Sequence, residues 1–254
     1  MDSFLLGMKL ATMFLLRYFL FAGIAFSLFY IVLQQTFQKH KIQQKQAKGI
    51  DFRREIFYSV VTNLIFVAIA LFVEFGPLAK HSQMYQDIHD FPLWYLPVSV
   101  ILALIIHDTY FYWMHRFLHI EPFYSRMHKT HHLSTNPSPF ASFAFHAGES
   151  VLEALIILIL IFIMPIHLYA ILAFTTSSLL INVYGHLGYE IMPKWFRQTK
   201  LFEVLNTSVH HNMHHQYFKG NYGLYFRFWD RLMGTENPTY VKHYEEVLAN
   251  SDQN

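Results

Sequence analysis

The chain has 254 residues, of which 54% are hydrophobic and 14% charged, with a net charge of +2 and no cysteine. The charged fraction is well below the roughly 25% usual in soluble domains, and the apolar residues form long uncharged runs, which argues against a water-soluble protein. The small net charge gives no indication of a nucleic-acid partner, and the lack of cysteine excludes disulfide frameworks, thiolate metal sites and thiolate nucleophiles.

The N-terminal part predicts two membrane-crossing helices. Residues 18–38 contain no Asp, Glu, Lys or Arg, and residues 10–16 extend this apolar run on the other side of Arg17. The second uncharged run covers residues 56–73. Because about 20 apolar residues cross a bilayer, each run is expected to span it. The first run is longer than a signal-peptide core, so residues 1–90 are expected to form a retained membrane anchor.

Two further apolar runs follow. Residues 91–106 form the third run, which continues into a polar and aromatic segment ending at His119. Residues 154–189 form the fourth, which is too long for one crossing and has Pro165 near its middle, so we expect a helical hairpin. The predicted fold is an all-α integral membrane protein with about four transmembrane helices and a helical cap.

The loop charges predict the orientation in the membrane. Residues 39–54 contain six basic residues against one acid, whereas residues 75–90 contain Lys80 against two acids. By the positive-inside rule the first loop is cytoplasmic and the second lies on the far side. The third run then returns to the cytoplasm, and a hairpin keeps everything after it there. We expect a multi-pass protein of a bacterial inner membrane or the endoplasmic reticulum, with its cap and active site facing the cytoplasm.

Histidines at helical spacing are the most specific feature of the chain. Positions three and four apart lie on one face of a helix, so such histidines can present their imidazoles together. Eight imidazoles arranged in this way exceed what one ion accepts, which predicts a centre with two metal ions. The groups are His115-x3-His119, His128-x2-His131-His132 and His211-x2-His214-His215.

Five other residues are candidates for the same centre. His186 follows Gly185 at the end of an apolar helix on the expected metal side, so it is predicted to be a further ligand. Asp108 precedes His115 by seven residues and is expected on the same helix stripe, where its carboxylate could accept a bond from a histidine N–H. Three more residues could either bind a metal ion or support a ligand: His146, Glu149 and Glu190.

Several chemistries remain open from spacing alone. Imidazole suits iron, zinc, copper and nickel, and the Glu-x-x-His motifs of carboxylate di-iron proteins are missing from the sequence, so a di-iron site here would be mostly histidine. Such a centre could activate O2, or it could act as a membrane hydrolase through zinc-bound hydroxide. A transport protein is a weaker alternative, because its ligands should line the membrane interior.

The ordered motifs resemble those of the fatty acid hydroxylase/sterol desaturase superfamily over roughly residues 95–237. The short gap between His119 and His128 favours this family over the acyl-CoA desaturases, whose first two boxes lie further apart. The resemblance is carried by Asp108-Thr-Tyr-Phe-Tyr-Trp-Met-His115-Arg-Phe-Leu-His119, Tyr124-Ser-Arg-Met-His128-Lys-Thr-His131-His132, Phe140-Ala-Ser-Phe-Ala-Phe-His146, Gly185-His186-Leu-Gly-Tyr-Glu190, His211-Asn-Met-His214-His215, Asn221-Tyr-Gly223, Phe228-Trp-Asp230-Arg231 and Gly234-Thr-Glu236.

The resemblance implies a membrane-bound hydroxylase or desaturase with a catalytic domain at residues 91–237 and a polar tail at 238–254. Family members use O2 as co-substrate and a non-haem di-iron centre, for which zinc can substitute in isolated protein. Their substrates are sterols, fatty acyl chains, alkyl lipids or carotenoids. Electrons would come from a separate cytochrome b5-like, ferredoxin-like or reductase partner. By position, the eight box histidines match the metal ligands, His186 matches a further one, and His146 aligns best with the sterol branch.

Overall fold

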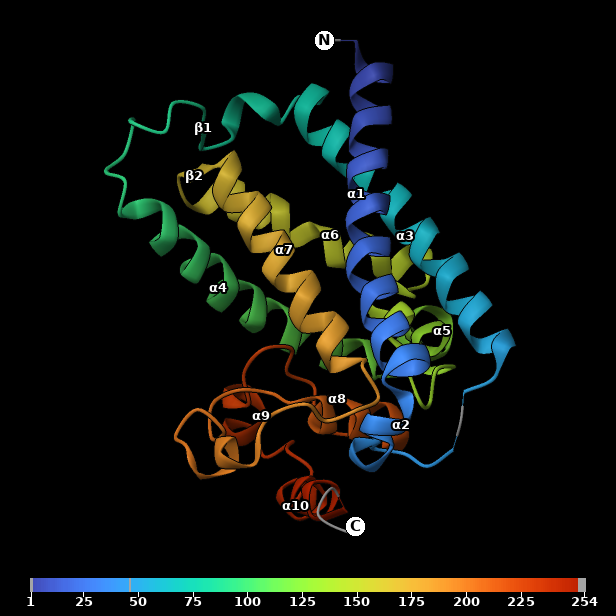
Figure 1. Cartoon of the computed structure of the whole chain (residues 1–254). Coiled ribbons are helices and arrows are strands. Elements are labelled where there is room, and N and C mark those ends of the chain that lie inside the picture. The colour runs from blue at the N-terminus through green and yellow to red at the C-terminus, as the bar shows by residue number, and fades with distance from the viewer. Residues whose placement is uncertain (1, 46, 251–254) are drawn as a thin grey trace.

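The computed structural model describes residues 2–45 and 47–250, and within them the fold is mostly helical (Figure 1). Four helical segments in this part of the chain are long and apolar enough to cross a membrane. The chain is thus an integral membrane protein, as predicted. The four segments are α1 (Ser3–Phe26) with its π-helical extension (Ser27–Val32), α3 (Gly49–Phe75), α4 (Tyr95–Leu118) and α7 (Leu168–Gly185).

The fourth apolar run forms the predicted hairpin. α6 (Ala147–Ile163) runs away from the cap and α7 returns toward it, with β2 (Ile166–His167) at the turn. β2 pairs in parallel with β1 (Met84–Tyr85), with Tyr85 opposite His167. The His167 Nδ1 accepts a hydrogen bond from the Tyr169 amide at 3.1 Å, so this histidine caps the start of α7. The hairpin therefore returns the chain to the end of the bundle at which it began.

Apolar side chains hold the bundle together. Tyr18 and Ala22 of α1 pack against Leu179 and Val183 of α7, and a second cluster joins α4, α6 and α7. Arg17 is a charged residue inside the first span, and its guanidinium donates to the Thr175 hydroxyl at 2.9 Å. Polar side chains within a membrane need such internal partners, because the surrounding lipid offers none.

Short helical turns connect α4 to α6 at the cap end of the bundle. They are a π-helical turn (Tyr124–His128), α5 (Lys129–His132) and a 3-10 helix (Pro139–Phe143). The Asn182 side chain of α7 donates to the Ser142 carbonyl at 2.7 Å, and Ser138 donates to the Glu55 carboxylate of α3. These contacts hold the second histidine group between the membrane helices and the cap.

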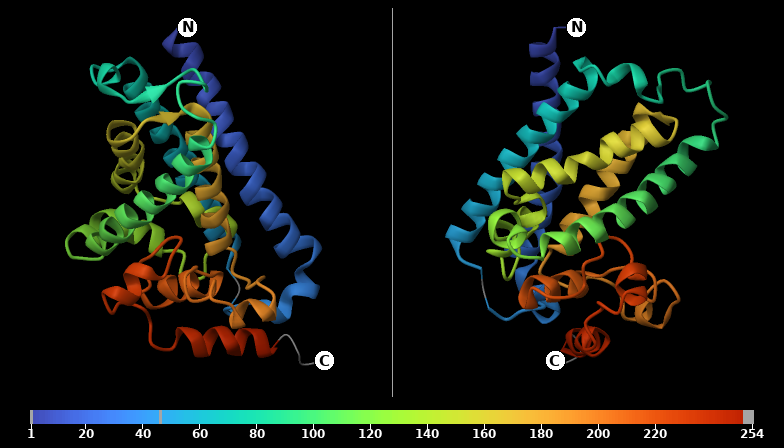
Figure 2. Two further views of the ribbon diagram at one scale, coloured as in Figure 1. Left: turned by 90° about the vertical axis from the view of Figure 1, so that its left-hand side faces the viewer. Right: turned by 180° about the vertical axis from the view of Figure 1, so that it is seen from behind.

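The cap covers the end of the bundle away from the N-terminus (Figure 2). It contains α8 (Ser208–Tyr217), α9 (Phe228–Leu232) and α10 (Tyr240–Asn250), preceded by one 3-10 turn (Lys194–Gln198). Two other short elements, α2 (Gln34–Phe37) and a 3-10 turn (Gln38–His40), lead from the first span into the loop beside the cap. A remaining 3-10 turn (Ala79–His81) lies in the connection between α3 and α4.

Residues 238–250 differ from the polar tail predicted for residues 238–254, of which residues 251–254 lie outside the described part of the chain. α10 places Tyr240, Tyr244, Val247 and Leu248 on one buried edge, where they join the core of the cap. The spacing of four, three and one residues brings these side chains onto one helix face despite the polar residues between them. The C-terminal helix is therefore part of the cap's hydrophobic core.

Candidate metal centre

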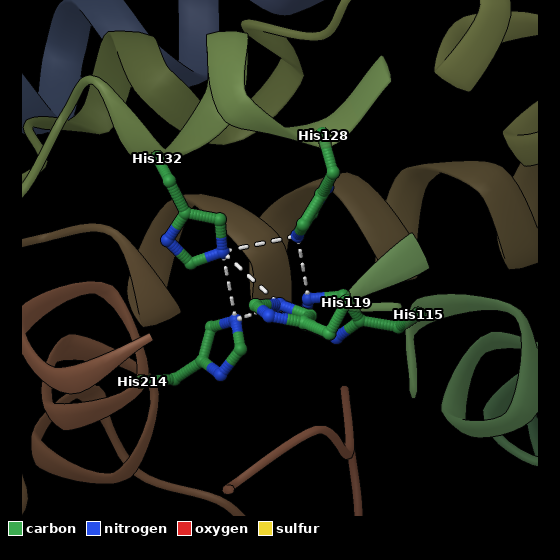
Figure 3. Close-up of side chains that lie close together, drawn as sticks. All are labelled: His115, His119, His128, His132 and His214. Carbon is green, nitrogen blue, oxygen red and sulfur yellow. Dashed lines mark hydrogen bonds between the residues drawn. The ribbon is translucent and has the colours of Figure 1, made fainter. Parts of the chain in front are cut away.

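Nine histidines of the described chain form two groups of converging ring nitrogens. The five-histidine group contains His115, His119, His128, His132 and His214, and the four-histidine group contains His131, His186, His211 and His215. Within each group, one nitrogen per ring lies within 4.8 Å of all the others. Figure 3 shows the first group, with His128 and His132 pointing from one helical segment toward His115, His119 and His214.

The helical spacing explains why two groups form. His115 and His119 lie on one stripe at the end of α4, four residues apart. Adjacent residues on a helix point about 100° apart, so a pair of consecutive histidines can serve two neighbouring groups. On α5, His131 and His132 divide in this way, and on α8, His214 and His215 do the same. The two groups are therefore neighbours that share two helices.

Hydrogen bonds at the far side of the rings fix which nitrogen faces the centre. A carbonyl or carboxylate oxygen can only accept, so a ring nitrogen bonded to one must carry the proton, which leaves the lone pair on Nε2. Five rings are held in this way through Nδ1: His115 by the Tyr222 carbonyl at 2.9 Å, His128 by the Glu149 carboxylate at 2.6 Å, His186 by the Asn182 carbonyl at 2.8 Å, His214 by the Gly220 carbonyl at 2.7 Å and His215 by the Ser134 carbonyl at 3.0 Å.

The facing nitrogens are very close to one another. The Nε2 atoms of His115 and His128 lie 3.0 Å apart, and those of His186 and His215 lie 3.2 Å apart. Two lone pairs at this distance repel unless a cation lies between them. The tautomers and distances together therefore fit a metal ion in each group, because ligand imidazoles offer a lone pair to the ion and a ring N–H to a second partner.

Burial keeps these rings neutral. Eight of the nine are buried, and His119 is the partly exposed one. Removal from water lowers the pKa of His186 to about 4, and burial together with neighbouring imidazoles lowers the pKa of His214 and His215 well below the usual 6.5. Neutral imidazole is the form that binds metal, so the rings are in the binding form at neutral pH.

The other sequence candidates fall into two kinds. Glu149 lies directly behind His128, with the supporting contact described above. His146 lies outside both groups, and its Nδ1 accepts from the Gly148 amide at 3.1 Å, which caps the start of α6. Glu190 is also outside them and accepts from the Tyr184 hydroxyl and the Val209 amide. These last two side chains thus organise helix ends and chain connections.

The predicted contact from Asp108 to a histidine is not present. Its carboxylate accepts from the backbone amides of Tyr225 and Phe226, at 2.7 and 3.2 Å. Seven helical residues separate Asp108 from His115, which is about 10 Å along the axis, too far for a short side chain to reach the ring. Asp108 instead fastens the segment before α9 to α4.

The role of residues 220–223 in orienting the histidines was not predicted from the sequence. Two carbonyls of this loop orient His115 and His214, which come from different helices. Asp230 holds the loop by accepting from the Tyr222 amide at 2.9 Å and the Gly223 amide at 2.7 Å. The Asn-Tyr-Gly motif marks the loop in the sequence, but its function depends on backbone atoms, which a residue pattern does not display.

The fold and the site define a class of protein: a helical integral membrane protein with a buried, two-part histidine centre beside the bilayer. The model of the family described as fatty acid hydroxylase matches residues 100–235, and the chain belongs to this family. The resemblance seen in its motifs is thus confirmed. No solved structure matches the chain.

Curated relatives include three sterol enzymes. Human lathosterol oxidase is 34% identical over 217 residues, which cover 83% of this chain and 69% of that protein. The Delta(7)-sterol 5(6)-desaturase of Leptosphaeria maculans is 30% identical, over 86% of this chain and 57% of its own length. Methylsterol monooxygenase 1 of Rattus norvegicus is 27% identical, over 86% and 73% respectively. All three are oxidoreductases by name, and the chain is an enzyme of this class.

Proposed function

We propose that this protein is a membrane sterol oxidoreductase that uses O2 and two iron ions, one in each histidine group. The observation that carries the proposal is the convergence of nine imidazole nitrogens in two adjacent groups. Imidazole ligands suit iron, and zinc as a substitute in isolated protein. A sterol substrate is supported by the printed names of the relatives.

The chain's own residues would bind and orient the ions. Hydrogen bonds from Nδ1 to oxygen acceptors orient the rings of His115, His128 and His214, so that their Nε2 lone pairs would face one ion. The same contacts orient His186 and His215 toward the other ion. Reduced iron held in this way supplies the reduction of O2 and the removal of hydrogen from an unactivated C–H bond. Glu149 lies behind His128, where a bound cation would favour the ionised form of its carboxyl group.

Aromatic side chains line the five-histidine group and leave His119 partly exposed. The ring of Tyr222 lies 5.1 Å from His119 and 5.6 Å from His214, and Tyr124 lies 5.5 Å from His119. Phe218 lies 5.1 Å from His132. This aromatic lining would reduce the contact of the site with water and suits an apolar substrate entering from the membrane.

The proposed orientation places the centre on the cytoplasmic side. The basic loop at residues 39–54 lies at the same end of the bundle as the histidines. Gln43 donates to the Asn212 side chain of α8 at 2.7 Å, and Arg54 donates to the Ser134 hydroxyl at 3.2 Å. Because basic loops stay on the cytoplasmic face, these contacts support a cytoplasmic centre in an endoplasmic reticulum or bacterial inner membrane, reached by a separate electron donor.

Product analysis under 18O2 tests the proposal. Membranes containing the protein, a reducing partner and a Δ7-sterol or a methylsterol should yield a sterol that carries 18O or that has lost two hydrogens. His214→Ala should remove this activity, whereas His89→Ala, at an exposed histidine outside both groups, should keep it. In a parallel reaction with 18O-labelled water and unlabelled O2, product oxygen derived from the water would support the alternative, a hydrolase with zinc-bound hydroxide. An active His214→Ala variant would contradict the proposed centre.

A further inference from the structure

The cap has two outer surfaces of opposite character. On α10, the side chains of Lys242 and Glu246 are 80% and 56% exposed. Another part of the cap exposes four apolar residues, which we call the apolar cap surface: Leu201 (56%), Val204 (48%), Phe228 (59%) and Leu232 (62%). Glu203 and Arg231, with side chains 45% and 48% exposed, lie among these apolar residues and pair with each other at 3.1 Å. The apolar cap surface thus carries one ion pair, and an exposed apolar patch of this kind on a protein usually marks an interaction site.

The four apolar residues belong to one continuous patch. Phe228 and Leu232 are four apart on α9 and therefore share a helix face. The Arg227 amide at the start of α9 donates to the Val204 carbonyl at 2.8 Å, and the Arg231 guanidinium donates to the Glu203 carbonyl at 2.9 Å. These bonds join α9 to the turn at residues 201–204 and hold the two apolar pairs next to each other.

The apolar cap surface adjoins a membrane helix. Trp229 of α9 donates from its indole N–H to the Thr109 hydroxyl at 3.2 Å, and its ring lies 5.5 Å from that of Trp113. Both contacts fall inside the candidate span Tyr95–Leu118. α9 lies beside the lower end of α4 in Figure 1. The cap therefore contacts α4 within its candidate membrane span.

The neighbouring surface of α4 has the composition of a membrane interface. Trp113 and Phe117 are 44% and 43% exposed, and the Arg116 guanidinium lies 5.9 Å from the Trp113 ring. Tryptophan is enriched at the headgroup level, and an arginine there can keep its charge in the polar layer while its stem lies along apolar groups. The apolar cap surface continues this interface away from the bundle.

We propose that the apolar cap surface is inserted into the membrane interface, with Leu201, Val204, Phe228 and Leu232 among lipid headgroups and the first part of the acyl chains. The occupant is lipid because the patch is continuous with a lipid-facing helix and lies at its depth. Arg231, which is bonded to Glu203, lies between the two apolar residues of α9 and would face the headgroups. This proposal depends on the membrane spans and not on the metal centre or the substrate.

Single-cysteine spin labelling tests this placement without background, because the chain contains no cysteine. Labels are attached in Leu232→Cys and Val204→Cys, both at exposed positions. Lys242→Cys on α10 serves as the water control and Ile101→Cys, at a 56% exposed position on α4, as the membrane control. The variants are placed in vesicles of phosphatidylcholine with a minority of phosphatidylglycerol. Collision rates with O2 and with a water-soluble nickel chelate are then measured.

The expected result is that the labels at 232 and 204 collide several-fold less with nickel than the label at 242, and more with O2, approaching the label at 101. Nickel collision equal to that at 242 would place the surface in water and overturn the proposal. Low collision with both reagents would indicate a protein partner such as a second copy, which would also overturn it. Metal content measured on the same samples keeps this outcome separate from that of the proposed function.

Discussion

Replacing Glu149 by glutamine should lower the metal affinity of the five-histidine group and leave that of the four-histidine group unchanged. The Glu149 carboxylate and the His128 ring are both buried, with side-chain exposures of 2% and 1%, and their atoms lie 2.6 Å apart. Glutamine keeps an acceptor oxygen at this position but cannot carry the negative charge that the carboxylate would have when a cation is bound by His128. The exchange therefore tests the electrostatic support of His128 without removing a metal ligand.

The size of the effect follows from this one contact. A hydrogen bond to a charged group contributes about 1.5–3 kcal/mol, and a neutral one about 1 kcal/mol. The difference of roughly 0.5–2 kcal/mol corresponds to about 2–30-fold in affinity. Changes behind a metal ligand generally cost about 10–100-fold. We therefore expect metal affinity about tenfold lower in the five-histidine group and unchanged in the four-histidine group.

Chelator competition on purified protein measures both affinities. Iron(II) or cobalt(II) is titrated against a chelator of intermediate strength, and bound metal is counted by mass spectrometry. Glu236→Gln is the control, because it also removes a carboxylate from a charged contact, with Arg227, but lies outside both histidine groups. Unchanged binding in Glu149→Gln, or an equal loss from both groups, would refute the reasoning.

Three further predictions concern the same centre. His214→Ala and His211→Ala should each lower the bound metal from two ions to one, from different groups, and metal counting in which either variant keeps both would contradict the assignment. Asp230→Asn should weaken the loop that orients His214 and so lower the affinity of the five-histidine group alone, as the same titration would show. Metal-free protein should lose thermal stability as the pH falls from 7 to 5. Burial lowers the folded-state pKa of His186 to about 4, so the unfolded chain binds a proton first, and stability that is present above pH 6.5 is lost toward pH 4. This ring alone contributes about 2 kcal/mol of that loss at pH 5, and a flat melting temperature over this range would contradict the argument.

Local spacing was sufficient to predict which histidines share a helix face. The pair on α4 and the triplet on α8 are set by helix geometry, which acts over a few residues. His186 could be predicted from its position at the end of an apolar run, because that position places it at the cap end of the bundle. The hairpin and the membrane spans follow equally directly from the length of the uncharged runs.

The remaining contacts depend on parts of the chain that are far apart in sequence. Asp108 binds amides more than a hundred residues away, and no pattern around Asp108 indicates that partner. The carbonyls of Gly220 and Tyr222 act through backbone atoms that every residue possesses. The buried face of α10 was not predicted, because polar residues separate Tyr240, Tyr244 and Val247 in the sequence, although the three have helical spacing.

The partial exposure of His119 gives the two halves of the centre different access to solvent. An ion bound in the five-histidine group would be nearest to solvent at this ring. An ion in the four-histidine group would be surrounded by four buried histidine rings. A chelator should therefore remove the ion of the five-histidine group first, while the ion of the four-histidine group is still bound. Preparations with about one ion per chain would then be a uniform, half-loaded species rather than a mixture of full and empty molecules.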